Sequence, residues 1–120
     1  MQWGTDEGKT LKPSGADYTG STDSTVKEQL KDKNSLLNHY KKVVKVRNSY
    51  PEISRSEGKA INLGNEHLFA MDLNGIIVVH NFSSEAVSFE GDYKIKDATL
   101  GGKQKGNTIT LQAYQSVIVE

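Results

Sequence analysis

Residues 68–82, "LFAMDLNGIIVVHNF", contain two apolar runs joined by the dipeptide Asn74-Gly75. Asn-Gly suits the two-residue type I′ turn, because both central residues of that turn have positive φ angles. The dipeptide between two such runs therefore predicts a β-hairpin. The second run is apolar almost without interruption, which is typical of a strand that is central in its sheet or buried on both faces.

The remainder of residues 53–120 shows the same pattern of short strands and turns. Further apolar or alternating runs are "GKAINL", "AVSF", "YKIKDATL", "NTITL" and "SVIVE". Turn dipeptides separate several of the runs: Gly64-Asn65, Gly91-Asp92, Gly101-Gly102 and Gly106-Asn107. About seven or eight short antiparallel strands in this region predict a mainly β fold, a β-sandwich or Greek-key barrel.

A helix is predicted ahead of the strands, in "SLLNHYKKVVKVRNSYPEI", residues 35–53. The spacing of its apolar residues is that of a single amphipathic helix. The predicted face consists of Leu36, Leu37, Tyr40, Val43, Val44 and Arg47. Pro51 is expected to end the helix, because proline disfavours helical geometry in the residue before it.

A shorter helix is predicted in "TVKEQLKD", which starts at Thr25. Thr25 and Glu28 have the spacing of a capping box, in which each side chain accepts a hydrogen bond from the other residue's backbone N–H. Asp32 or Asn34 is then expected to cap the long helix, since both types favour that position.

Residues 1 to about 24 have no helical or strand period and are rich in Gly, Ser, Thr and Asp, so they are predicted as a loop. Trp3 is the single tryptophan of the chain. A tryptophan in such a loop can stack on a sugar ring or anchor the loop by packing, and the sequence favours neither role.

Composition limits the classes of partner. The chain has 120 residues, with 15 Lys and Arg against 15 Asp and Glu, so it carries no net charge. Nucleic acid is not expected as a partner, because phosphate binding needs a basic excess. The chain has no cysteine, which excludes disulfides and thiolate metal sites, and no apolar run long enough to span a bilayer. Such a composition fits the cytosol or bacterial secretion equally well.

No catalytic constellation is recognisable in the sequence. His39, His67 and His80 are scattered over one predicted helix and two strands, without the spacing of metal ligands, and are interpreted as structural. Asn81 begins a glycosylation sequon, "NFS", but is interpreted as an asparagine that closes a strand into a turn. We therefore expect no catalytic residue, no metal ligand and no cofactor in this chain.

Four segments, in order, resemble the end of enzymes of glycoside hydrolase family 13, the α-amylase family. "MQWG" with the loop after it and "KDKNSLLNHYKKVVKVRNSYPEI" resemble the last loop and helix of the family's catalytic (β/α)8 barrel. "LFAMDLNGIIVVHNFSS" and "ITLQAYQSVIVE" resemble the start and the closing strands of its C-terminal β-domain. The resemblance implies that residues 1–52 complete the barrel and that residues 53–120 form an antiparallel β-domain.

The resemblance also implies a function for the parent enzyme, namely hydrolysis of starch-type α-glucans. Retaining hydrolysis needs two carboxyl groups about 5 Å apart. The family carries its catalytic carboxylates on earlier barrel strands, so none of them maps onto this chain. Gln2 and Trp3 would lie near the substrate rim, because active sites of such barrels are built from the loops after the strands.

The expected partners of the chain follow from the same resemblance. The helix face would pack on the barrel of the parent, and the fragment alone would be a monomer or a weak dimer. The parent would be bacterial and would lie outside the cell or on its surface, with the cytoplasm as the alternative. Whether it is an amylase, an oligo-1,6-glucosidase or a glucan transferase stays open.

Two other functions compete with this interpretation: a free-standing carbohydrate-binding β-sandwich, and a protein-interaction domain that uses the helix face. Exposed aromatic side chains discriminate between them, because a sugar-binding module needs two or three coplanar rings on one face. Four aromatic residues of the strand region are predicted to lie in the core instead: Phe69, Phe82, Phe89 and Tyr93.

Overall fold

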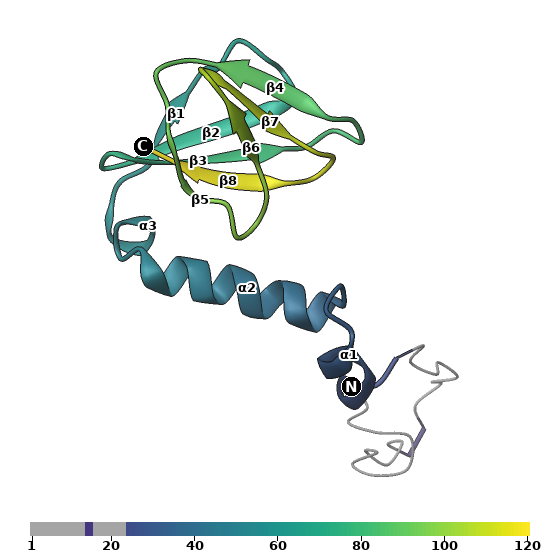
Figure 1. Cartoon of the computed structure of the whole chain (residues 1–120). Coiled ribbons are helices and arrows are strands. Elements are labelled where there is room, and N and C mark those ends of the chain that lie inside the picture. Colours follow the sequence, from purple (N-terminus) through teal and green to yellow (C-terminus); the bar gives the residue numbers. More distant parts are fainter. Residues whose placement is uncertain (1–13, 16–23) are drawn as a thin grey trace. The chain divides into compact units, whose positions relative to one another are not determined.

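The computed structural model describes residues 14–15 and 24–120 (Figure 1). Gln2 and Trp3, and most of the predicted loop, lie outside the described residues. The chain divides into two compact units, Met1–Val44 and Lys45–Glu120. The boundary predicted between residues 52 and 53 concerns the domains of a parent enzyme, and it stays a prediction.

Helix α1 spans Val26–Lys31 and has the predicted capping box. The Glu28 N–H donates to the Thr25 hydroxyl (3.3 Å), and the Thr25 N–H donates to the Glu28 carboxylate (2.7 Å). The pKa of Glu28 is lowered because these hydrogen bonds from Thr25 favour its charged form.

Helix α2 spans Leu36–Ser49, and the prediction of its cap was wrong. The hydroxyl of Ser35 accepts a hydrogen bond from the Asn38 N–H (3.3 Å), as an N-cap side chain does. Asp32 instead accepts from the Asn34 N–H (2.9 Å), which closes the turn between the helices. Several candidate caps in a row left the sequence ambiguous, and the turn decided which residue stands at the helix start.

Pro51 ends α2 as predicted, but it also starts another helical turn. Helix α3, Glu52–Arg55, follows directly, with Pro51 at φ −57° and ψ −25°. Helix α3 was not predicted, although proline at a helix start is a known signal because its fixed φ suits the first turn.

The eight strands form two antiparallel sheets, which confirms the predicted fold class. The strands are β1 (Lys59–Ile61), β2 (Leu68–Leu73), β3 (Ile76–Asn81), β4 (Val87–Glu90), β5 (Ile95–Asp97), β6 (Lys103–Lys105), β7 (Thr108–Leu111) and β8 (Ser116–Val119). One sheet has the order β1-β2-β3-β8-β5 and the other β4-β7-β6. The two sheets face each other (Figure 1).

The predicted hairpin joins β2 to β3, with Leu73 paired to Ile76. Asn74 and Gly75 have φ angles of 61° and 92°, as the type I′ turn requires. Strand β3 lies between β2 and β8, so its central position is confirmed. Strand β6 was missed because "KQK" contains no apolar residue and all three side chains are exposed.

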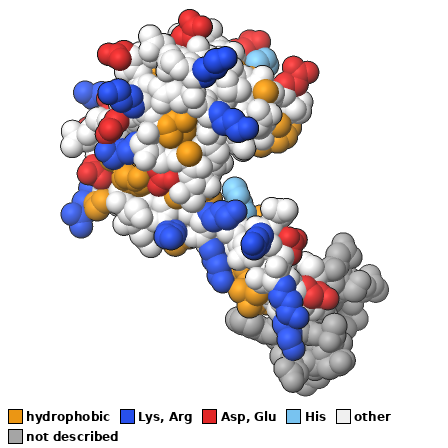
Figure 2. All heavy atoms as spheres, viewed as in Figure 1, with side chains coloured by type: hydrophobic (Ala, Val, Ile, Leu, Met, Phe, Trp, Pro, Cys, Tyr) orange, Lys and Arg blue, Asp and Glu red, His pale blue; other side chains and the backbone are white. Residues whose placement is uncertain are grey.

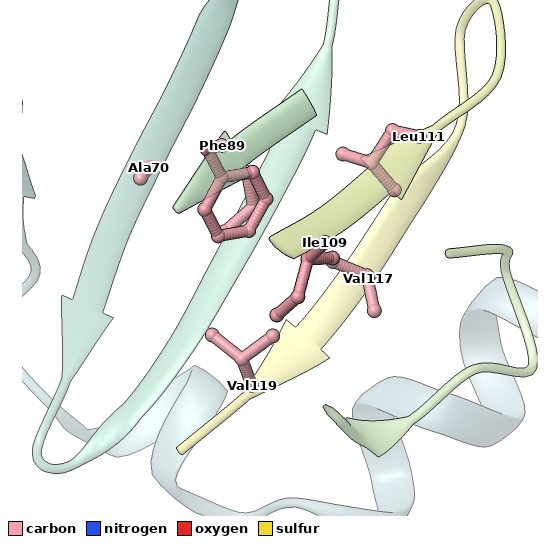
Figure 3. Close-up of a cluster of buried hydrophobic side chains, with 7 residues drawn as sticks. Ala70, Phe89, Ile109, Leu111, Val117 and Val119 are labelled. Carbon is pink, nitrogen blue, oxygen red and sulfur yellow. The ribbon is translucent and has the colours of Figure 1, made fainter. Parts of the chain in front are cut away.

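The main core lies between the two sheets (Figure 3). Its buried side chains are Ala70, Val79, Phe89, Ile109, Leu111, Val117 and Val119. Both sheets contribute to it, and their outward residues alternate with these inward ones, as in any β-sandwich. The larger sheet therefore has a second, outer face.

A smaller cluster lies on that outer face. Val46 of α2 is buried with Ile76 and Ile118, and four partly buried side chains surround them: Tyr50, Ile53, Val78 and Leu100. Within the unit of residues 45–120, the end of α2 and the turn of α3 thus cover part of the larger sheet.

Candidate functional site

The first candidate surface is the α2 face, which we define as Leu36, Leu37, Tyr40, Val43 and Val44. Leu36, Tyr40 and Val44 are 66%, 61% and 51% exposed. Apolar side chains grouped on one side of a helix normally face a core. Within the described residues this face has no such cover, so it has the character of a docking surface.

Polar contacts hold the start of this face in place. The side chain of Gln29 accepts a hydrogen bond from the Leu37 N–H (3.1 Å). The amide of Asn38 donates to the carbonyl groups of Gln29 (2.8 Å) and Asp32 (2.7 Å). Hydrogen bonds thus close the corner between α1 and α2. The apolar side chains of the α2 face remain available for packing against another surface.

The far end of α2 is fixed differently. Val46, which is not part of the predicted helix face, is 5% exposed. The Tyr50 hydroxyl donates to the Asp97 carboxylate (3.1 Å). Hydrogen bonds from the side chain and backbone of Thr99, together with that from Tyr50, lower the pKa of Asp97, and burial raises the pKa of Tyr50. These contacts anchor the helix end to the sheet.

The second candidate surface is the aromatic patch, which we define as Phe69, His80 and Phe82. The prediction that Phe69 and Phe82 lie in the core was wrong, because they are 41% and 67% exposed. Phe89 is buried as predicted, and Tyr93 packs beside it at a ring distance of 5.9 Å. In the structure Leu68 and Ala70 face the core, and neighbouring residues of a strand point to opposite faces, so Phe69 points outward.

The three rings of the patch contact one another at different angles. Phe69 stacks on His80 with centroids 6.4 Å apart and planes inclined by 22°. Phe82 meets Phe69 edge to face at 6.3 Å and 68°, and lies 6.0 Å from His80. Figure 2, in which apolar side chains are orange, shows such side chains reaching the surface in both units.

His80 joins the patch to the neighbouring strand. Its Nδ1 lies 2.6 Å from the Ser116 hydroxyl, and partial burial lowers the pKa of His80. His39 and His67 are exposed, on other elements. Among residues 14–15 and 24–120, no three His, Asp or Glu side chains are grouped so as to hold a metal ion.

Asn81 has the structural role that the sequence indicated. Asn81 is 2% exposed, and its side-chain amide donates to the carbonyl groups of Glu85 (2.7 Å) and Gln112 (3.0 Å). Its side-chain oxygen accepts from the Ser83 N–H (2.9 Å). The sequon asparagine is thus engaged inside the fold, where it closes β3 into the next turn.

Two of the shallow hollows in the described part of the chain are lined in part by helix or turn residues. One, of about 320 Å³, lies between α1 and the start of α2. The other, of about 380 Å³, lies beside the β2–β3 turn and carries side chains of both charges, among them Arg55, Glu57 and Lys59. In the same described part, none of the helices has the length and hydropathy needed to cross a membrane.

No family model matches the chain, but a curated enzyme does. Over an alignment of 98 residues that covers 75% of the chain, it is 31% identical to α-amylase 3 of Dictyoglomus thermophilum, of which it covers 20%. The chain therefore spans about a fifth of the length of this curated relative.

Solved structures show the same fold. Eubacterium rectale Amy13B matches 99% of the chain with a TM-score of 0.80 at 24% identity, and the chain covers 26% of that protein. The α-amylase from H. orenii matches 80% of the chain with a TM-score of 0.64 at 23% identity, and the chain covers 22% of it. A trehalose-6-phosphate hydrolase of Bacillus licheniformis matches 79% with a TM-score of 0.61 at 23% identity, and the chain covers 20% of it. The chain belongs to glycoside hydrolase family 13, the α-amylase family, and corresponds to the C-terminal part of such an enzyme.

Proposed function

We propose that the chain is the non-catalytic C-terminal part of a glycoside hydrolase that cleaves α-1,4 or α-1,6 glucosidic bonds in starch-type glucans. The carrying observation is the 31% identity to an α-amylase of which the chain covers only 20%. A match to a small part of a longer enzyme fits a supporting domain better than a complete catalyst.

The α2 face is the surface by which this part would bind the remainder of the enzyme. Burying a large apolar side chain fully stabilises a fold by roughly 1.5–3 kcal/mol. Leu36, Tyr40 and Val44 still have much of that area to bury. A (β/α)8 barrel that lacks its last helix has an apolar gap of matching chemistry, so residues 1–52 would complete the barrel. Gln2 and Trp3 would then belong to the loop near the substrate rim.

We place the parent enzyme outside the bacterial cell or on its surface. Starch-type polymers are too large to cross a membrane intact, so an enzyme that attacks them works where they are found.

A carbohydrate-binding module is the second candidate, and the exposure of Phe69 and Phe82 favours it. A sugar ring stacks on flat aromatic surface, however, and these two rings are inclined by 68°. The patch therefore fits a sugar ring less well than it fits an irregular apolar surface.

The test starts from the sequence that precedes residue 1 in the genome and from the enzyme that it encodes together with this chain. That enzyme is expected to hydrolyse starch. The double variant Leu36→Gln with Val44→Gln should lower its thermal midpoint measurably, since burying each large apolar side chain fully stabilises a fold by roughly 1.5–3 kcal/mol. Lys42→Gln, an exposed neutral substitution on the same helix, is the control.

Two outcomes contradict the proposal. The first is a preceding sequence without a barrel and its catalytic carboxylates. The second is an intact enzyme whose thermal midpoint responds no more to the double variant than to the control.

A further inference from the structure

We infer that the aromatic patch of Phe69, His80 and Phe82 is a second docking surface, and that it receives an apolar helix from the barrel part of the same enzyme. The inference rests on the proposed function, but it concerns a different surface from the α2 face.

The patch belongs to the outer face of the larger sheet. Phe69 pairs with His80 across β2 and β3, and their neighbours Ala70 and Val79 are buried in the main core. Since side chains alternate along a strand, Phe69 and His80 point away from that core. Phe82 follows Asn81, whose side chain is turned inward and buried, so Phe82 extends the same outer row.

This outer face is already a helix-packing surface over its other half. The outward side chains of β3 and of the turn after it run Ile76, Val78, His80 and Phe82. Ile76 is 7% exposed under Val46 of α2, and Val78 is partly buried beside it, whereas Phe82 is 67% exposed. One row of side chains, apolar except for His80, therefore passes from a covered region into an uncovered one.

The chemistry of the patch suits an apolar occupant. Two phenylalanine rings carry no polar group, and partial burial favours the neutral form of His80. The rings are inclined to one another by 22°, 68° and 47°, which makes a ridged surface rather than a flat platform for sugar. Side chains of a helix form ridges and grooves that fit such a surface.

The length of the relatives indicates where this helix comes from. The chain covers 20% of α-amylase 3 and 26% of Amy13B, so most of the length of such an enzyme lies outside the part that matches this chain. A helix from that part would cover the half of the outer sheet face that α2 leaves exposed.

Cysteine labelling tests the inference, because the chain has no cysteine of its own. Phe82→Cys and, as the control, Ser88→Cys are each placed in the isolated 120-residue chain and in the intact enzyme. Ser88 is an exposed residue of β4, in the other sheet. A thiol reagent, with the labelled peptide identified by mass spectrometry, should react about tenfold or more slowly with residue 82 in the intact enzyme than in the isolated chain. Residue 88 should react equally fast in both.

Other outcomes overturn the inference and identify another occupant. Equal labelling of residue 82 in both proteins means that the patch is uncovered in the enzyme. Protection that grows with the concentration of the isolated chain means a second copy, and protection that needs added maltooligosaccharide means a glucan site.

Starch hydrolysis by the same intact enzyme separates the inference from the proposed function. An active enzyme with fast labelling at residue 82 keeps the function and removes the docking surface. An inactive enzyme with residue 82 protected does the reverse.

Discussion

Asn81 shows how one polar residue determines local structure at the end of a strand. Its buried amide donates to two carbonyl groups from separate segments, Glu85 and Gln112. Glu85 and Gln112 are exposed, whereas Asn81 is 2% exposed, and a buried polar group left without a partner destabilises a fold by about 1–3 kcal/mol. Asn81 therefore ties the turn after β3 to the turn before β8.

Replacing Asn81 with aspartate should destabilise the chain by about 2–4 kcal/mol, because a carboxylate offers no donor to those carbonyl groups and places charge in a buried site. Urea unfolding measures the change. Asn62→Asp is the matched control: Asn62 is exposed and only accepts, from the Gly64 N–H (2.8 Å), so its variant should unfold like the original chain. Equal midpoints for the two variants would contradict the role of Asn81.

His80 makes the stability of the chain depend on pH. Burial lowers its pKa in the folded chain below the ordinary value, so the unfolded chain binds a proton at a pH where the folded chain does not. Stability should therefore be constant above the unfolded pKa of about 6.5 and fall as the pH drops from there toward the folded pKa.

The variant His80→Asn should remove this component, since asparagine does not titrate. Unfolding in urea at a series of pH values from 7.5 to about 5, above the carboxylate range, measures it. His39 and His67, both exposed, are present in the two proteins and provide the background. A pH profile of the variant that parallels that of the original chain would show that His80 is not responsible.

At the scale of elements, the two ends of α2 differ in how far their apolar side chains are covered. Leu36, Tyr40 and Val44 are exposed, whereas Val46 is buried against Ile76 and Ile118. The helix is thus anchored to its sheet by one valine and the tyrosine after it, while its longest apolar stripe is left for another partner.

The two valines give a matched pair on one helix. Val46→Ala should destabilise the unit of residues 45–120 by about 1–2 kcal/mol, since it removes two buried carbon atoms and leaves a cavity. Val44→Ala changes helix propensity equally but removes only half-exposed surface, so it should cost far less. Thermal unfolding followed by circular dichroism compares them. Equal losses would mean that α2 is not packed on the sheet through Val46.

At the scale of the whole molecule, some large apolar side chains form the main core and others remain exposed on two surfaces. The main core is enclosed between two sheets, yet the α2 face and the aromatic patch keep large apolar side chains at the surface. Contiguous exposed apolar surface usually marks a binding site. Both surfaces fit a chain that forms one part of a larger enzyme.

The isolated chain is expected to release no reducing sugar from starch, whereas the intact enzyme should do so. The reason is that retaining hydrolysis needs a carboxylate pair about 5 Å apart, and under the proposed function that pair lies in the part of the enzyme that this chain does not cover. The isolated chain and the intact enzyme are assayed at equal molar concentration, with a commercial amylase of known activity as the positive control. Release of reducing sugar in proportion to the amount of purified chain would contradict the proposal that this chain is non-catalytic.

The amino-acid sequence alone determined the features that depend on neighbouring residues. Asn74-Gly75 predicted the β2–β3 hairpin because few other dipeptides accept two positive φ angles, and Thr25 with Glu28 predicted the start of α1 because the capping box closes within three residues. The unbroken apolar run after Gly75 predicted the central strand of its sheet. These local signals, with the other short strands and turns, were enough for the fold class, whereas the resemblance to the α-amylase family rests on four matching segments in order.

Tertiary structure alone decided which side chains are covered. Val46 is buried because β3 and β8 lie beneath it, and Phe82 is exposed because no described element covers that part of the sheet. Strand β6 forms because β7 supplies hydrogen bonds to a segment that has no apolar residue of its own. Burial and pairing depend on segments distant in the sequence, and the pattern of one segment carries no record of what lies opposite it.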